Sequence, residues 1–229
     1  MVRIVFVGDS LVHKSAVDHG LLDQVSAQLA SRHPAQRFEV LDAGVNGNTI
    51  ADIQARLDDD VIALRPAAVV LYWDSDVSDV DESRMSAAEV AALRSTYRAI
   101  LQDVLTRLVR SGAHVIVSGP TLIGEAPRGK NPKDGMLDDY RRINRAVARA
   151  LNVAYVDTRR AFLAQPLQQA ASGQHTTPLT EDGEHLSDVG AAVARRQFVA
   201  AIDAWLRSRP APAPRAPGGG PRPILRPAP

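Results

Sequence analysis

Five short apolar runs recur along the chain, and after each comes a segment whose apolar residues repeat every three or four positions. The runs are continuously apolar rather than alternating, which is typical of strands buried on both faces of a parallel sheet. We expect strands at residues 3–7, 38–43, 67–73, 114–119 and 153–158. We expect helices at residues 21–32, 50–64, 86–112, 136–151 and 188–208.

Repeated strand–helix units connect through right-handed crossovers and leave helices on both faces of the sheet. The pattern therefore predicts an α/β fold, a three-layer α/β/α sandwich around a flavodoxin-like, five-stranded parallel sheet of order 2-1-3-4-5. Residues 1–208 are expected to form this one domain. Residues 209–229 are almost entirely Pro, Ala, Gly and Arg, and we expect a disordered tail because they bury too little apolar surface to offset the entropy of ordering.

Composition narrows the class of protein. The chain is 45% hydrophobic and 23% charged, as is common in soluble globular proteins. A formal net charge of +1 gives no reason to expect nucleic acid or an acidic membrane as partner, and without cysteine there is no thiolate metal site. The chain opens on a strand rather than a signal peptide, and no stretch reaches transmembrane length, so we expect a cytoplasmic protein.

Ligands of such a sheet bind beyond the carboxyl ends of the strands, near the point where the strand order reverses. Three loops are expected there, at residues 8–11, 44–49 and 74–79, and the order 2-1-3 puts Ser10 in the middle of them. A fourth segment, residues 181–190, precedes the last helix and could return to the same edge.

Ser10 is a candidate nucleophile. Gly8 permits a sharp bend after the first strand, which would hold the Ser10 hydroxyl near a helix N-terminus. A serine hydroxyl is a weak nucleophile until a base takes its proton. The alternative is that Asp9 or Ser10 simply caps the next helix.

Asp182 and His185 could supply that base. They are three residues apart just before the last helix, so one turn can bring the carboxylate to the imidazole and fix its tautomer. The alternative is a glycine-containing turn with a surface histidine. No carboxylate is placed in this way, ahead of a terminal helix, at the other histidines, which are His13, His19, His33, His114 and His175.

Gly47 is a candidate oxyanion donor. A glycine presents its backbone N–H with no side chain in the way, and acyl transfer needs donors aimed at the developing charge. The alternative is a tight turn into the helix expected at 50–64, with Asn48 or Thr49 as its cap.

Together these segments resemble the SGNH hydrolases, also called the GDSL esterase/lipase family. The sequence GDSL at 8–11 resembles the first block of that family, NGNT at 46–49 the second, and DGEHLS at 182–187 the last. Their order and spacing match across roughly residues 3 to 207.

The resemblance implies a role for each site residue. Ser10 would be the nucleophile, His185 the general base and Asp182 its orienting carboxylate. The backbone N–H groups of Ser10 and Gly47 would be oxyanion donors.

The third block departs from the family pattern, which has Gly-x-Asn-Asp after the third strand. Alignment on the strand end puts Asp76 where the oxyanion-binding asparagine belongs. An ionised carboxylate has no proton to donate, and losing one such donor costs about 3 kcal/mol in comparable sites. Asp76 could be protonated and donate through its O–H, or turn away and leave the amide to Asn46 or Asn48, or mark a site that has lost hydrolysis.

The sequence therefore predicts a serine esterase that hydrolyses a carboxylic ester of a small molecule through an acyl-enzyme, without a cofactor. The segment 119–136 is polar and basic and should overhang the site, which favours a short acyl group on a polar alcohol; an ordinary surface loop fits equally well. The main alternative, motivated by Asp76, is a non-hydrolytic ligand-binding protein on the same scaffold. A third is a metal-dependent hydrolase using the acidic residues of one loop, Asp74, Asp76, Asp79, Asp81 and Glu82.

Overall fold

The computed structural model describes residues 1–14, 20–78, 80–126, 130–171 and 177–209. Five parallel strands form one sheet in the order β2-β1-β3-β4-β5, which confirms the predicted topology. The strands are β1 (Val2–Gly8), β2 (Phe38–Gly44), β3 (Ala68–Tyr72), β4 (His114–Ser118) and β5 (Ala154–Val156).

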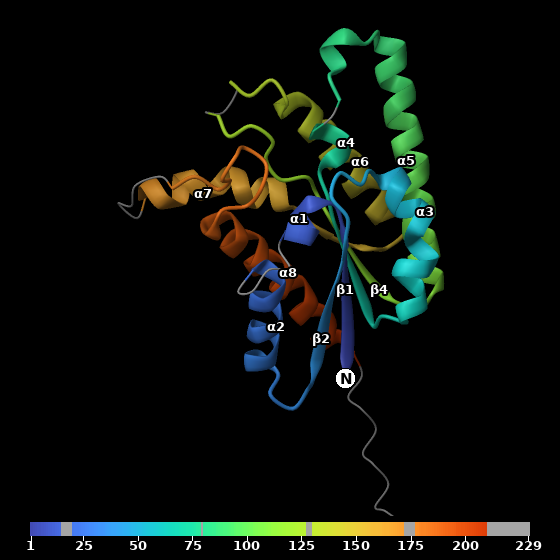
Figure 1. The fold of residues 1–229 in the computed structure, drawn as a ribbon, viewed down its shortest axis with the longest axis vertical. Helices are drawn as coiled ribbons and strands as arrows, with labels where there is room; N and C mark the ends of the chain where they lie inside the picture. Colours follow the sequence, from blue (N-terminus) through green and yellow to red (C-terminus); the bar gives the residue numbers. More distant parts are fainter. Residues whose placement is uncertain (15–19, 79, 127–129, 172–176, 210–229) are drawn as a thin grey trace, which may run out of the picture.

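Helices cover both faces of this sheet and enclose two apolar cores (Figure 1). On one face lie α3 (Ile50–Asp60), α5 (Ala87–Arg110) and α6 (Asp134–Ala150). On the other lie α2 (Leu21–Arg32), α7 (Thr158–Ala171) and α8 (Asp188–Ser208). Alternate strand residues point to opposite faces: Val5 packs with the first set of helices, and Ile4 and Phe6 with the second.

Local sequence signals start several helices. Thr49 caps α3 and Ser86 caps α5, each in a reciprocal capping box with the residue three positions on. The helix predicted over 50–64 ends earlier, at Asp60. A short 3-10 turn, Ile62–Leu64, follows, and Arg65 adopts the left-handed backbone conformation, at φ 50°, directly before Pro66.

The sequence analysis missed α7 (Thr158–Ala171) and two short helices, α1 (Ser10–His13) and α4 (Ser75–Ser78). Helix α7 contains Pro166, a residue that normally argues against a helix interior. The strand predicted over 153–158 stops at Val156, and its last predicted residue, Thr158, begins α7 instead.

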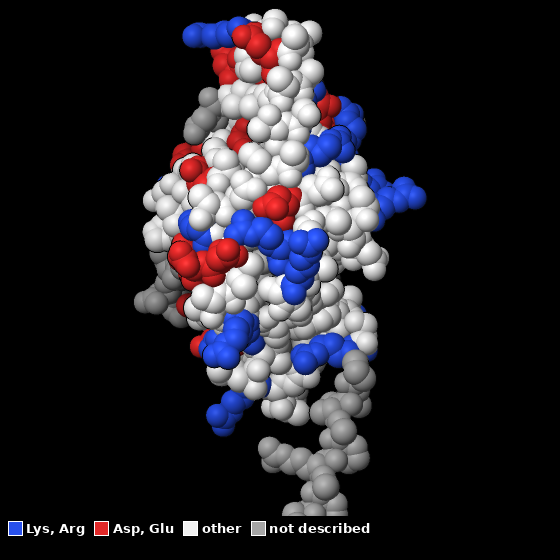
Figure 2. All heavy atoms as spheres, turned by 90° about the vertical axis from the view of Figure 1, so that its right-hand side faces the viewer, with Lys and Arg blue, Asp and Glu red and all other residues white. Residues whose placement is uncertain are grey.

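Charged side chains on the face over α3 and α5 are mixed in sign (Figure 2). Arg107 of α5 lies 2.8 Å from Asp58 of α3, and Arg56 lies 3.2 Å from Asp60. None of the helices in the described part of the chain is long and apolar enough to span a bilayer. Residues 210–229 of the predicted tail lie outside the described residues.

Candidate active site

The turn after β1 carries Ser10 as the first residue of α1. Asp9 caps this short helix, because its Oδ1 accepts a hydrogen bond from Leu11 N at 2.9 Å. Gly8 is required: a Cβ there would lie 1.8 Å from the Tyr72 carbonyl oxygen of the neighbouring strand. The capping alternative and the nucleophile hypothesis are therefore compatible, since Asp9 caps and the adjacent Ser10 remains at the carboxyl edge of the sheet.

The structure brings Ser10, His185 and Asp182 together from opposite ends of the chain. His185 Nε2 lies 3.1 Å from Ser10 Oγ, and His185 Nδ1 lies 2.6 Å from Asp182 Oδ2. Asp182 Oδ1 accepts from the backbone N–H groups of His185 at 2.8 Å and Glu184 at 3.0 Å. The hydrogen bonds from His185 and Glu184 hold the pKa of the Asp182 carboxyl well below its usual range, so it is ionised when it faces the imidazole.

A short hairpin, residues 179–187, presents Asp182 and His185 to the sheet edge; we call it the catalytic hairpin. Thr180 pairs with Leu186 in an antiparallel bridge, and Glu181 N donates to the His185 carbonyl at 2.8 Å. Ser187 then caps α8 by accepting from Gly190 N at 3.2 Å. The hairpin and the start of α8 thus fix the direction from which His185 approaches Ser10.

Gly47 lies in the loop after β2, at φ 71°, a backbone conformation that favours glycine. Within the described residues, no hydrogen-bond acceptor contacts its N–H. Arg56 joins this loop to the nucleophile strand, donating to Asn48 Oδ1 at 2.7 Å and to the Gly8 carbonyl at 3.1 Å. Thr49, rather than Asn48, caps the following helix.

Asp76, placed by the sequence alignment at the position of the oxyanion-binding asparagine, accepts hydrogen bonds at the start of α3 and from Trp73. Its Oδ2 accepts from Ile50 N at 2.7 Å and from Trp73 Nε1 at 2.8 Å. Burial raises the pKa of the Asp76 carboxyl to about 6, although these two hydrogen bonds oppose the rise. The geometry matches the expectation of a side chain turned to other partners better than that of a protonated oxyanion donor.

Ser75 is a site residue that the sequence analysis did not single out. Its backbone N and Oγ donate to Asp9 Oδ2 at 2.8 and 2.7 Å, beside the nucleophile turn. The signal was present in WDSD: if Asp76 is aligned with the last aspartate of Gly-x-Asn-Asp, Ser75 takes the place of the asparagine.

Asp74 is a second buried acid behind the nucleophile turn and is 2% exposed. Burial, and then the neighbouring charge of Asp9, raises the pKa of the Asp74 carboxyl to about 7. Its Oδ2 accepts from Thr121 N at 2.9 Å and from the Thr121 hydroxyl. Asp9, Asp74 and Thr121 thus link the loops after β1, β3 and β4.

The acidic residues of the loop after β3 contact different partners. Asp81 Oδ1 accepts from Ser83 N at 3.1 Å, and Glu82 pairs with Arg94 at 2.6 Å. Among the described residues, no group of three or more His, Asp or Glu could hold a metal ion, and Asp79 lies outside them.

A cavity of about 370 Å³ opens beside Ser10 and His185, between the N-terminal ends of α2 and α8. Among the described residues, the apolar part of its lining is aliphatic and comes from Leu11, Leu21, Leu186 and Ala191. Its polar lining comes from Lys14, Gln24, Glu181, Ser187 and Asp188.

Comparisons with known proteins agree with this geometry. Residues 6–193 match the family model described as GDSL-like Lipase/Acylhydrolase. An acetylxylan esterase of Geobacillus stearothermophilus is 26% identical over 221 residues, covering 90% of this chain and 97% of that protein.

Solved structures show the same fold. The crystal structure of the acetyl xylan esterase AlAXEase has a TM-score of 0.76 and 27% identity, covering 88% of this chain and all of that one. Axe2, an acetylxylan esterase from Geobacillus stearothermophilus, has a TM-score of 0.72 and 26% identity, covering 91% and 97%.

The chain therefore belongs to the GDSL-like lipase/acylhydrolase (SGNH) family. Within that family it is a carboxylic ester hydrolase, related in sequence and in structure to acetylxylan esterases.

Proposed function

We propose that this esterase removes short acyl groups, acetyl in particular, from hydroxyl groups of a carbohydrate. The observation that carries the chemistry is the chain of contacts from Ser10 Oγ through the His185 ring to Asp182, at 3.1 and 2.6 Å. The relatives named above are acetylxylan esterases, and the cavity beside Ser10 carries the polar side chains of Gln24, Glu181 and Asp188, which can bind sugar hydroxyl groups.

The reaction begins with proton transfer from Ser10 Oγ to His185 Nε2. Oγ attacks the ester carbonyl, while Asp182 stabilises the imidazolium through Nδ1. The tetrahedral intermediate collapses as His185 returns the proton to the departing alcohol oxygen, which leaves an acyl-enzyme. Water then gives one proton to His185 and attacks the acyl carbon. The second tetrahedral intermediate collapses as His185 returns that proton to Ser10 Oγ, and the carboxylic acid leaves.

Backbone donors bind the oxyanion in this proposal. The N–H groups of Ser10 and Gly47 are the two donors. The hydroxyl of Ser75 donates its proton to Asp9, and the Asp76 carboxylate accepts a hydrogen bond at the start of α3. In this proposal neither side chain donates a hydrogen bond to the oxyanion. In the loop that carries Gly47, the side-chain amides that could add a donor are those of Asn46 and Asn48.

The test compares wild type with Ser10→Ala on p-nitrophenyl acetate and on acetylated xylo-oligosaccharides. We expect Ser10-dependent turnover of both, and activity that falls from acetyl to octanoyl esters. A fluorophosphonate probe should label Ser10, as located by mass spectrometry. Turnover that survives in Ser10→Ala would refute the nucleophile, and a preference for octanoyl esters would refute the short-acyl substrate.

A further inference from the structure

The segment between β4 and α6, residues 119–133, runs to the catalytic hairpin; we call it the insertion. Its described residues, 119–126 and 130–133, contact three neighbouring elements: the catalytic hairpin, α7 and α4. Glu125 makes the most direct of these contacts, and the inference below rests on the function proposed above.

The Glu125 carboxylate binds the first strand of the catalytic hairpin. Its two oxygens lie 2.9 and 3.0 Å from Leu179 N, and Oε2 also accepts from Thr180 N at 3.0 Å and Thr180 Oγ1 at 2.8 Å. Next to it, Gly124 N donates to the Gly183 carbonyl at 2.7 Å, inside the turn between Asp182 and His185. The insertion therefore holds the hairpin both at its base and at its tip.

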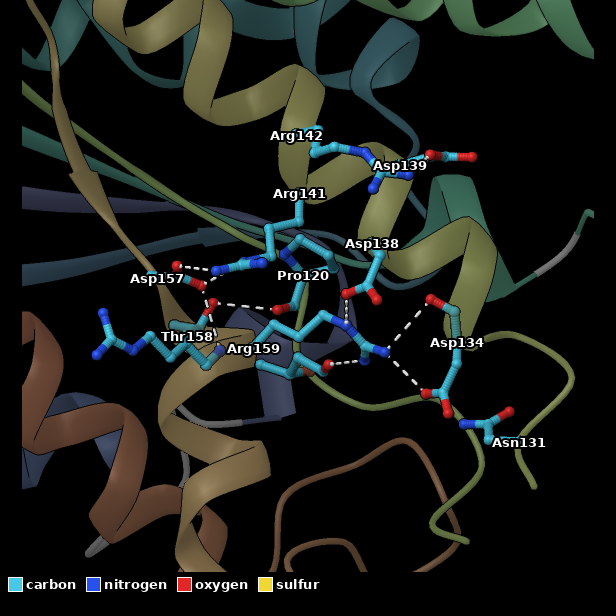
Figure 3. Close-up of polar contacts among 12 residues, drawn as sticks. Pro120, Asn131, Asp134, Asp138, Asp139, Arg141, Arg142, Asp157, Thr158 and Arg159 are labelled. Carbon is cyan, nitrogen blue, oxygen red and sulfur yellow. Dashed lines mark hydrogen bonds and ion pairs between the residues drawn. The ribbon is translucent and has the colours of Figure 1, made fainter. Parts of the chain in front are cut away.

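A buried arginine fixes both ends of the insertion (Figure 3). Arg159 of α7 is 1% exposed. It donates to the Thr121 carbonyl at 3.2 Å, to Asp134 Oδ1 at 2.7 Å and to Asp138 Oδ1 at 2.7 Å. Thr121 lies four residues before Glu125, and Asp134 is the first residue of α6. Arg159 therefore contacts the chain on both sides of the loop that carries Glu125.

The insertion also braces the loop after β3. Lys133 Nζ donates to the carbonyls of Val77 at 2.8 Å and Ser78 at 3.0 Å, at the end of α4. Asn131 Nδ2 donates to the carbonyls of Ile123 and Gly124, both at 2.6 Å, which shapes the backbone just ahead of Glu125. These hydrogen bonds hold the backbone on both sides of Glu125 and so fix the position from which its side chain reaches the hairpin.

We infer that Glu125 is a positioning residue for catalysis: its carboxylate holds the catalytic hairpin so that His185 stays within proton-transfer distance of Ser10. Three donors of the hairpin, the N–H groups of Leu179 and Thr180 and the Thr180 hydroxyl, lose their acceptor without it. The side chain itself is exposed, so its removal leaves the two apolar cores intact.

The test uses Glu125→Ala and Glu125→Gln, with Lys130→Ala as the control for an exposed residue of the same insertion. Because a misplacement of about 1 Å can cost about 100-fold in rate, we expect Glu125→Ala to lose about 10- to 100-fold in kcat on p-nitrophenyl acetate. KM should stay within about twofold, since the removed contacts do not touch substrate. Glu125→Gln keeps one acceptor oxygen and should recover most of kcat.

A second readout does not depend on activity. Amide hydrogen exchange at Leu179 and Thr180, followed by nuclear magnetic resonance, should be about tenfold faster or more in Glu125→Ala and unchanged in Lys130→Ala. Unchanged exchange at both amides, or a kcat of Glu125→Ala within about twofold of wild type, would overturn the inference. If wild type shows no Ser10-dependent hydrolysis, the proposed function fails, whereas the exchange experiment still decides whether Glu125 holds the hairpin.

Discussion

Replacing Asp76 with asparagine tests how a buried carboxylate at the edge of the site is used. Its Oδ2 accepts from Ile50 N at 2.7 Å and from Trp73 Nε1 at 2.8 Å. Asparagine has the same shape and keeps one oxygen for these two donors, but it carries no charge. The substitution therefore isolates the cost of holding a negative charge at this position.

The size of the expected change in the free energy of unfolding follows from the pKa of the Asp76 carboxyl, which burial raises from 3.8 to about 6. About two pKa units correspond to about 3 kcal/mol between the ionised and protonated forms. The Asp76 carboxyl keeps its proton to higher pH in the folded state than in the unfolded state. Ionisation of Asp76 therefore lowers the free energy of unfolding as pH rises from about 4 to about 6. We expect Asp76→Asn to match wild type near pH ~4 and to be more stable by about 2–3 kcal/mol at pH ~8.

The assay is urea unfolding followed by far-ultraviolet circular dichroism across this pH range. The difference between variant and wild type removes the common contribution of Asp74, whose carboxyl pKa is also raised, to about 7. Asp59→Asn, at an exposed position of α3, is the control and should run parallel to wild type. If Asp76→Asn also runs parallel to wild type from pH ~4 to pH ~8, the reasoning from burial is wrong.

Activity of the same variant separates the two interpretations of Asp76. As an acceptor at the start of α3, it can be replaced with a change in kcat below about threefold at pH ~8. As a protonated oxyanion donor, it would make wild-type kcat fall as pH rises through about 6, and Asp76→Asn would exceed wild type by about 100-fold at pH ~8. Initial rates on p-nitrophenyl acetate distinguish these outcomes.

Two further substitutions test the site and its frame. Asp182→Asn should lower kcat by about 10³- to 10⁴-fold with little change in KM, because the imidazole loses the carboxylate that fixes its tautomer; kcat within about tenfold of wild type would contradict the triad. Gly8→Ala should destabilise the fold by about 3 kcal/mol or more, because its Cβ would lie 1.8 Å from the Tyr72 carbonyl oxygen; a melting temperature equal to wild type would contradict it.

Much of the frame could be predicted from the sequence because its signals are local. Continuous apolar runs indicated buried parallel strands, and chain order with right-handed crossovers restricted the sheet to few topologies. Ser86 indicated the start of α5 through its capping box with Glu89, only three positions further along the chain. The three family blocks identified Ser10 and the pair that the structure places beside it.

Only the tertiary structure decided what each polar group around Ser10 contacts. Asp76 finds Ile50 N across 26 positions of the chain, and Ser75 finds Asp9 across 66. Glu125 meets Leu179 across 54 positions, from a loop with no regular pattern. Periodicity and capping report on neighbours within a turn or two of the chain, whereas these partners depend on how separate loops pack at one edge of the sheet. The sequence determined the scaffold and the catalytic residues to test. The tertiary structure determined which carboxylates cap helices, which hold the loops of the site together and which one orients the catalytic histidine.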